Sequence, residues 1–409
     1  MTDFAHRWGF SADRFWLHGA PPKAPVEFDE ALGRWNVYGY PEIVEVLNDP
    51  EAYTPNCTRL FDLSAEAAQY VEGDMSQMTG PEHTHIRGQV GRAFTPKALD
   101  GLEGRIRELA RELVDDLAGL DRFDLLGDFV EDVSAIAFSE LLGTPVEERE
   151  VLRVKDQAMD YEGEMSTLDS GEDYFDGLTA PLAPLREFVG KYVDERVREP
   201  RDDLLSLLAG FRKLDGTALT RDQIINFAIS ILGAGRLATP MLSGNALLCL
   251  ESFPDQAALV RADRSLVPGM LEESMRFVTP ANVSFRATNV DVRLGGHRIA
   301  KDQLVMLWFG AANRDPRQFT DPDEFDVLRN PNPHLGFGRG AYYCVGAQLV
   351  RIETRIMFNL LMDYFPDLRV DPDRSPVFFR SPEFTGVRSM SVRPAGPNAA
   401  GRSYVRPAA

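Results

Sequence analysis

Cysteine is scarce in this chain of 409 residues, which contains only Cys57, Cys249 and Cys344. Three cysteines this far apart in the sequence do not form a disulfide framework, and they fit a reducing compartment. The class of small, disulfide-bonded secreted proteins is therefore excluded.

Long apolar runs are also missing, since none approaches the ~18 residues that a membrane-spanning helix needs. The first residues, Met1 to Phe4, lack the basic-then-apolar pattern of a signal sequence. We therefore expect a cytoplasmic protein without a membrane partner.

Basic residues are outnumbered, because 44 Lys and Arg against 63 Asp and Glu give a formal net charge of −19. A charge of this sign argues against nucleic acids and anionic membranes as partners, and solubility is its simplest explanation. Motifs for phosphate loops, dinucleotide binding, zinc clusters and a serine nucleophile elbow are absent, and the sequence has no internal repeat.

The residues that are present suit a globular protein with a large core, with 44% hydrophobic and 26% charged residues. Composition does not divide the chain, so we expect one domain over residues 31–395. Residues 1–30 contain three prolines between positions 21 and 25 and are expected to be irregular. Residues 396–409 are rich in proline, glycine and alanine and are expected to be a disordered tail.

Hydrophobic periodicity indicates a mainly helical chain. Apolar residues recur at helical spacing over residues 99–142, with a break at 123–125, and a long helix is expected over 222–250. Aromatic and β-branched residues predict a strand at 34–39. Residues 290–296 resemble the first strand and turn of a hairpin.

The most informative stretch is HLGFGRGAYYCVG, residues 334–346, which places Cys344 between glycines and directly before a helix-prone run. Gly338 and Gly340 permit backbone angles closed to other residues and a close approach to a flat group. Because a helix start has exposed N–H groups and a positive dipole end, it favours a thiolate. Cys344 is therefore a candidate anionic ligand, and a buried structural thiol is the alternative.

The pattern Phe-Gly-x-Gly-x-x-x-Cys-x-Gly resembles the haem-binding loop of cytochrome P450 enzymes. The resemblance implies a mainly α-helical cytochrome P450 fold with small β-sheets and one haem b, iron protoporphyrin IX. It also implies that Cys344 is the axial iron ligand and that Phe337, Gly338 and Gly346 lie beside the cofactor.

Further residues match the family's propionate-binding positions. His83 and Arg87 lie four residues apart, so they share one face of a helix, although a solvated surface pair is the alternative. By resemblance these two residues and Arg286 hold haem propionates. Tyr342 stands where many bacterial relatives have a propionate-binding histidine or arginine, and a phenol donates one hydrogen bond without a charge.

The resemblance also implies a structural network. Glu273 and Arg276 lie three residues apart on one helix face, and Arg329 follows the turn-forming stretch 321–326. Together they match the family's Glu-Arg-Arg network, which fixes the loop under the haem and is not catalytic.

The middle of the long helix departs from the family. Pro240 cannot donate to the carbonyl of Arg236, which predicts a kink, and nearby glycines would let a flat ligand approach. The family's usual acid and alcohol, which deliver protons, are replaced by Leu237 and Ala238. Thr239 is one residue on, ~100° around the helix, and cannot simply take over. The residues expected at the reaction centre are Ala234, Gly235, Leu237, Ala238 and Thr239.

The resemblance places a lid over the substrate within residues 145–212, although core packing explains each candidate lid residue equally well. The turn at residues 378–385 is expected to dip back into the active site. The candidate lid contacts are Met159, Tyr161, Met165, Tyr174 and Phe175. The substrate pocket is expected to include Ile86, Ile231, Val283, Ser284 and Phe384.

The activity implied is oxidation of a natural-product intermediate in secondary metabolism by a monooxygenase-family oxidoreductase. The missing acid–alcohol pair favours radical coupling of aromatic substrates, such as tryptophan-containing cyclodipeptides or phenols, through a C–C or C–N bond. The alternative is a hydroxylase or epoxidase in which the substrate or a water delivers protons. A non-catalytic haem sensor is a more remote possibility.

The implied electron donors are a ferredoxin and its ferredoxin reductase, and the protein is expected to be a monomer. A small acidic ferredoxin would dock on a locally basic patch, since opposite potentials steer weak electron-transfer encounters. The residues expected in this patch are Arg87, Arg92, Lys97 and Arg339.

Overall fold

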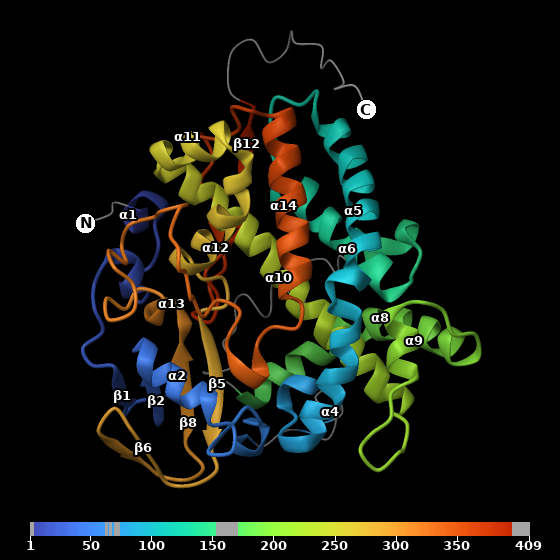
Figure 1. Ribbon diagram of the computed structural model, residues 1–409, viewed down its shortest axis with the longest axis vertical. Helices are drawn as coiled ribbons and strands as arrows, with labels where there is room; N and C mark the ends of the chain where they lie inside the picture. The colour runs from blue at the N-terminus through green and yellow to red at the C-terminus, as the bar shows by residue number, and fades with distance from the viewer. Residues whose placement is uncertain (1–3, 62–63, 65–67, 69–73, 153–170, 395–409) are drawn as a thin grey trace.

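The computed structural model describes residues 4–61, 64, 68, 74–152 and 171–394. Within these residues helices predominate and the strands form four small sheets (Figure 1). The expected mainly helical fold with small sheets is confirmed. The helices are α1 (Phe4–Trp8), α2 (Tyr40–Asn48), α4 (Gly80–Val90), α5 (Pro96–Leu117), α6 (Glu131–Leu142), α8 (Gly171–Arg198), α9 (Leu204–Ala209), α10 (Arg221–Ser252), α11 (Pro254–Ala262), α12 (Val267–Phe277), α13 (Phe309–Ala312) and α14 (Ala347–Tyr364).

The largest sheet has the strand order β1-β2-β8-β5-β3. Its second strand is the one expected near residue 34, and it runs parallel to β8, with Trp35 opposite Val305. The expected hairpin is β6 and β7, joined at Gly295 and Gly296, which both have positive φ. The strands are β1 (Val26–Asp29), β2 (Arg34–Val37), β3 (Tyr53–Thr54), β4 (Phe123–Asp124), β5 (Val283–Thr288), β6 (Val292–Leu294), β7 (His297–Ile299), β8 (Leu304–Trp308), β9 (Arg369–Val370), β10 (Val377–Phe378), β11 (Val387–Ser389) and β12 (Ser391–Arg393).

The first thirty residues are more regular than expected. They contain α1, a 3₁₀ turn at Phe15–His18 and β1, which pairs antiparallel with β2 at the edge of the large sheet. Phe4 and Trp16 are buried in the main core. The prolines occupy only the connection before β1, so they do not prevent regular structure on either side.

The long helix α10 lies at the centre of the molecule (Figure 1) and packs against α6, α8, α12 and α14. A capping box starts it, because Thr220 and Gln223 exchange side-chain and backbone hydrogen bonds. The helix continues through Pro240, so the proline does not interrupt it. Although α10 is long and apolar enough to cross a membrane, 56% of its most apolar stretch is buried in the protein, as suits a core helix.

The predicted break near residue 123 is also present. It contains β4 and a π-helical turn at Leu126–Val130, and it separates α5 from α6. The inner faces of both helices join a core that extends from Phe4 to Val392.

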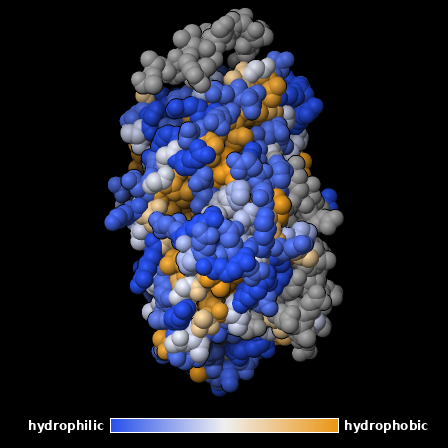
Figure 2. All heavy atoms as spheres, turned by 90° about the vertical axis from the view of Figure 1, so that its right-hand side faces the viewer, coloured by the Kyte–Doolittle hydropathy of each residue, from blue (hydrophilic) through white to orange (hydrophobic). Residues whose placement is uncertain are grey.

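Hydrophilic residues cover most of the outer face shown in Figure 2, with apolar residues between them.

An ion-pair network at the end of α12 supports the cysteine loop. Arg276 donates twice to the carboxylate of Glu273, at 2.7 and 2.8 Å, and Arg329 donates at 3.1 Å, so the expected pairs are present. Arg276 also donates to three backbone carbonyls, including that of Asn313. The Asn313 side chain accepts from the N–H of Leu335 at 2.7 Å, which ties the network to the loop.

Replacing Glu273 with glutamine should destabilise the fold by about 3–5 kcal/mol, because the buried Arg276 guanidinium would lose its counter-charge. Urea unfolding followed by circular dichroism measures this change. Glu108→Gln is the control, since Glu108 pairs with Arg105 at the surface and should have little effect. Equal unfolding midpoints for both variants would contradict this role of Glu273.

Candidate active site

A cavity of about 650 Å³ lies between α10, the start of α14, β5 and the cysteine loop. Its size is that of a pocket for an organic ligand, and its walls are mostly apolar. The lining includes Met75, Phe94, Phe138, Phe227, Ile231, Ala234, Ala238, Val283, Phe285, Phe309, Phe337, Cys344, Val345, Leu349 and Val350.

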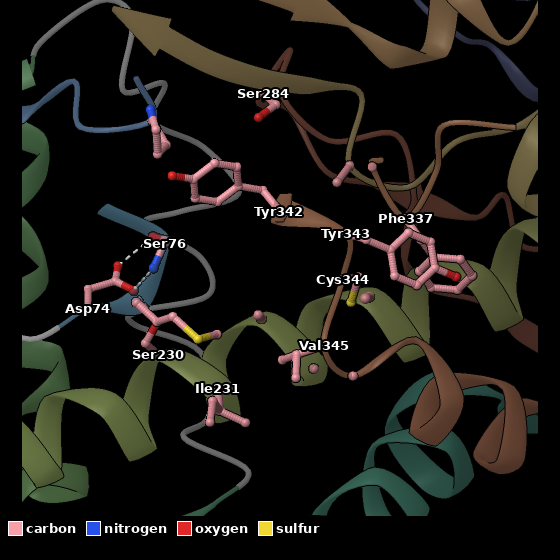
Figure 3. Close-up of a pocket in the computed structure, with 18 of the residues that line it drawn as sticks. Asp74, Ser76, Ser230, Ile231, Ser284, Phe337, Tyr342, Tyr343, Cys344 and Val345 are labelled. Atoms are coloured by element: carbon pink, nitrogen blue, oxygen red, sulfur yellow. Dashed lines mark hydrogen bonds between the residues drawn. The ribbon is translucent and has the colours of Figure 1, made fainter. Parts of the chain in front are cut away.

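The loop carrying Cys344 is shaped by its glycines. Gly338 and Gly340 have φ of 68° and 71°, which other residues rarely adopt, as the sequence predicted. The N–H of Cys344 donates to the carbonyl of Phe337 at 2.8 Å, and α14 begins three residues later. Cys344 therefore lies at the cavity wall just before the helix (Figure 3).

The thiol itself is not ionised by this setting alone. Burial raises the pKa of Cys344, while the N–H groups of Gly346 and Ala347 and the charges of Arg87 and Arg351 only partly lower it. The expected thiolate-favouring helix start is present, but burial outweighs it. A bound metal cation is what would deprotonate this sulfur.

A second ion pair, not foreseen from the sequence, supports the loop from below. Arg351 donates to both oxygens of Glu272, at 2.7 and 2.8 Å, and its guanidinium lies 4.6 Å from the ring centre of Phe337. Burial opposes ionisation of Glu272, but Arg351 and His334 lower its pKa to about 2. The sequence offered one weak signal for this pair, namely that Glu272 directly precedes Glu273 of the predicted network on the same helix.

The three basic side chains predicted to hold haem propionates line the cavity. His83 is buried, and Arg87 is half-buried and donates to the carbonyl of Tyr343. Arg286 is 5% exposed, and within the described part of the chain it donates to two neutral oxygens, those of Ser284 and Phe285. Burial lowers the pKa of Arg286, and no carboxylate of the described residues pairs with it. The Arg286 guanidinium is therefore placed to receive an anionic group.

Tyr342 is at the cavity wall but is already engaged. Its hydroxyl donates to the carbonyl of Met78 at 3.0 Å, and its ring stacks on His83 with 4.3 Å between ring centres. A phenol has one proton to donate, so the predicted hydrogen bond to a propionate is not available in this arrangement.

The α10 wall differs from expectation in two ways. Ala234, Gly235, Ala238 and Thr239 line the cavity, whereas Leu237 does not, because the lining residues follow one face of the helix. A Cβ on Gly235 would lie 2.1 Å from the ring of Phe138. This glycine therefore admits Phe138 rather than a flat ligand, and Thr239 faces the cavity despite its rotation.

Of the predicted substrate residues, only some lie at the cavity wall. Ile231, Val283 and Ser284 line the cavity, but Ile86 is fully buried in the core. Phe384 pairs with Ala281 in a β-bridge, and the neighbouring Glu383 reaches the cavity instead, since successive side chains alternate. Of the proposed lid contacts, Met159, Tyr161 and Met165 lie outside the described residues, as do the side chains of Tyr174 and Phe175.

One end of the cavity is polar. Asp74 accepts hydrogen bonds from the backbone and hydroxyl of Ser76, at 2.8 and 2.7 Å, and from the hydroxyl of Ser230 at 3.0 Å. Figure 3 shows this group on the far side of the pocket from Cys344. Its sequence neighbourhood is polar and uneven, so only the tertiary structure reveals that it faces the cavity.

A soft ligand, a buried guanidinium without a carboxylate partner among the described residues, and apolar walls fit a flat, largely apolar metal complex with carboxylate groups. The described residues contain no cluster of three or more His, Cys, Asp and Glu side chains that could hold a bare metal ion. The cavity therefore suits a haem better than an isolated cation.

The family model for cytochrome P450 matches residues 184–389. The chain belongs to the cytochrome P450 family. A crystal structure of HmtN, described as a post-tailoring hydroxylase involved in himastatin biosynthesis, is 43% identical, with a TM-score of 0.87 over 97% of this chain and 100% of that one.

Two named relatives support the same assignment. The cyclomarin C epoxidase CymV of Salinispora arenicola is 32% identical over 382 residues, covering 92% of this chain and 94% of the relative. The cytochrome P450 monooxygenase PikC of Streptomyces venezuelae is 32% identical over 381 residues, covering 92% and 89%. This cytochrome P450 is accordingly a haem b-dependent oxidoreductase of the monooxygenase type.

Cys344→Ala should abolish the absorption band of a thiolate-ligated haem in reduced protein treated with carbon monoxide, because the variant lacks the sulfur at the cavity. Cys57→Ala is the matched control, since Cys57 also lines the cavity and burial raises its pKa to about 12. If Cys57→Ala lost the band and Cys344→Ala kept it, the assignment of Cys344 as the iron ligand would be wrong.

Proposed function

We propose that this cytochrome P450 inserts one atom of dioxygen into a natural-product intermediate bound in the cavity beside Cys344. In this proposal Cys344 holds the haem iron, Phe337, Gly338 and Gly346 lie beside the cofactor, and His83, Arg87 and Arg286 hold its propionates. The observation that carries it is a cysteine at the wall of a mostly apolar cavity, together with a buried guanidinium, that of Arg286, which has no carboxylate partner among the described residues.

The bound haem supplies dioxygen activation, and the chain supplies the surroundings. The apolar side chains of α10 and β5 exclude bulk water from the space beside Cys344. Exclusion of water also strengthens each polar contact inside the cavity. The residues of this chain therefore bind and orient the substrate.

Two observations favour oxygen insertion. HmtN is described as a hydroxylase and CymV as an epoxidase, and both resemble this chain over nearly its whole length. In addition, Thr239 brings a hydroxyl to the cavity, while Leu237 does not face it. The wall beside Cys344 is therefore less apolar than the sequence suggested.

Oxidative radical coupling, the activity favoured by the sequence, is the second candidate. Ala238 lines the cavity where the family usually has an alcohol, and the surrounding wall is rich in aromatic side chains. Such a wall would keep a substrate radical away from water. Coupling would join two aromatic molecules without adding oxygen. The mass of the product therefore distinguishes coupling from oxygen insertion.

The polar end of the cavity indicates a substrate with a hydrogen-bond donor or a cation far from its reacting carbon. Asp74 is the acceptor, and its position opposite Cys344 sets how the substrate lies (Figure 3). A carboxylate at a mostly apolar wall discriminates strongly against ligands that leave it unpaired.

The proposed electron donors are a ferredoxin and its reductase, acting in the cytoplasm on a monomer. Arg92, Lys97 and Arg339 are exposed, so they remain candidates for the docking patch. Arg87 is half-buried and lines the cavity, which leaves it less available to a partner.

A turnover in ¹⁸O₂ tests the proposed reaction. Oxygen insertion predicts that the main product is heavier than the substrate by one labelled oxygen atom, because the other atom leaves as water. High-resolution mass spectrometry reads this directly, and a parallel turnover in H₂¹⁸O shows whether oxygen comes from solvent. A dimeric product without label would establish coupling instead.

Asp74→Asn should weaken binding of a cationic probe such as tryptamine by about tenfold or more, since a hydrogen bond to a charged group contributes ~1.5–3 kcal/mol. The asparagine keeps the size and an acceptor for the N–H of Ser76. Binding of the neutral analogue tryptophol should hardly change. Ser76→Ala is the control that keeps the charge, and equal losses for both probes would contradict the role of Asp74.

A further inference from the structure

The carboxylate of Glu272 is bound to residues on both sides of Cys344. Glu272 lies on α12, and its two oxygens accept from Nε and Nη2 of Arg351 at 2.7 and 2.8 Å. Nε2 of His334 lies 3.1 Å from one of the same oxygens. His334 begins the cysteine loop, and Arg351 lies on α14, which follows the loop. The segment that carries the sulfur is therefore tied to one anion at both ends.

The hydrogen bonds of His334 indicate which of these partners carries the positive charge. Nδ1 of His334 accepts from the N–H of Gly336 at 3.1 Å, so the ring proton is on Nε2 and is donated to Glu272. The imidazole is neutral in this arrangement. Arg351 is therefore the cation that the Glu272 carboxylate neutralises.

Arg351 contacts the residues next to the sulfur, and Figure 3 shows Phe337 and Tyr343 beside Cys344. Its guanidinium lies 4.6 Å from the ring centre of Phe337, whose carbonyl accepts from the N–H of Cys344. Arg351 also donates to the hydroxyl of Tyr343 at 3.1 Å. The charges of Arg87 and Arg351 lower the pKa of the Cys344 thiol, although burial raises it overall. A positive charge on Arg351 therefore favours negative charge on the sulfur and on a group bound to it.

Glu272 limits this effect of Arg351. The two side chains form a bidentate pair without net charge, so the field of the pair falls off faster with distance than that of a lone guanidinium. Both side chains are half-buried, and salt therefore screens them less than it screens a fully exposed pair.

We propose that the Glu272–Arg351 pair sets the reduction potential of the haem iron that Cys344 holds. Arg351 raises this potential, and Glu272 offsets the rise. Neither residue lines the cavity, so both are positioning residues that act through the loop and through their charges. The step concerned is a one-electron transfer, in which the ferredoxin is oxidised, the haem iron is reduced and no bond breaks. The inference rests on the proposed ligation by Cys344 and is independent of the reaction that the substrate undergoes.

Redox titration of the holoenzyme tests this inference without turnover. Glu272→Gln leaves the Arg351 charge uncompensated, so the ratio of reduced to oxidised protein at a fixed potential should rise by about threefold or more, ~30 mV for one electron. Arg351→Gln leaves the Glu272 charge and should lower the ratio by a similar factor. The double variant carries neither charge and should titrate close to the natural chain.

A second ion pair on α14 supplies the matched control. Arg355 pairs with Glu103 at 2.7 Å and lies about one helical turn beyond Arg351. Arg355 is not one of the charges that act on the Cys344 thiol. Glu103→Gln should therefore leave the potential nearly unchanged.

The sign of the shifts separates an effect of charge from an effect of structure. Damage to the loop would move both single variants in the same direction or remove the carbon monoxide band of the thiolate-ligated haem. Shifts of one sign, absence of any shift, or loss of the band from every variant would overturn the proposal. If Glu272→Gln alone does not fold, Arg351→Lys decides, because it keeps the charge and should titrate above Arg351→Gln; equal potentials would overturn the proposal.

This inference and the proposed function fail on different results. If Cys344→Ala retains the thiolate band, the ligand assignment fails, and the inference fails with it. If that assignment holds and the two charge variants do not diverge, only the role of the Glu272–Arg351 pair is lost. The origin of the product's oxygen does not affect the redox titration.

Discussion

The cysteine loop depends on the hydrogen bonds that the buried carboxylate of Glu273 accepts. This carboxylate accepts hydrogen bonds from the side chains of Arg276, Arg329 and Asn332 and from the backbone of Asp326. Burying two opposite charges costs desolvation free energy, and this cost is offset only when every donor is used. The segment from Asp326 to Asn332 is therefore restrained, because its displacement would remove partners from a buried carboxylate.

The cavity imposes a different requirement from the buried ion pairs. Its walls must remain apolar to exclude water, yet the chemistry needs a few polar groups within them. This protein places them at separate points: Cys344 at the loop, Asp74 at the far end, and Glu353 with Thr239 between α14 and α10. Arginines neutralise Glu273 and Glu272, whereas Glu353 remains without a cation in the described part of the chain.

Local signals were sufficient for much of the fold. The helical periodicity and the glycine pair of the hairpin agree with α5, α6, α10 and β6–β7, because these features depend on nearby residues. The N-terminal segment was misjudged, since β1 exists through pairing with β2 and the prolines lie outside it. Strand pairing of this kind is a tertiary effect that propensity does not report.

The same division holds for the site. Cys344, Gly338, Gly340 and the Glu273–Arg276 spacing could be identified from the sequence, because short motifs encode backbone angles and helix faces. Which side chains face the cavity could not, as Leu237, Ile86 and Phe384 demonstrate. Packing between elements sets the rotation of a helix or strand about its own axis. A step of one residue turns the side chain by ~100° around a helix and to the opposite face of a strand. The sequence alone thus determined the family's ligand loop and the elements around it. Only the tertiary structure decided that Thr239 and Glu353 meet, because their 114-residue separation is closed by the packing of α10 against α14.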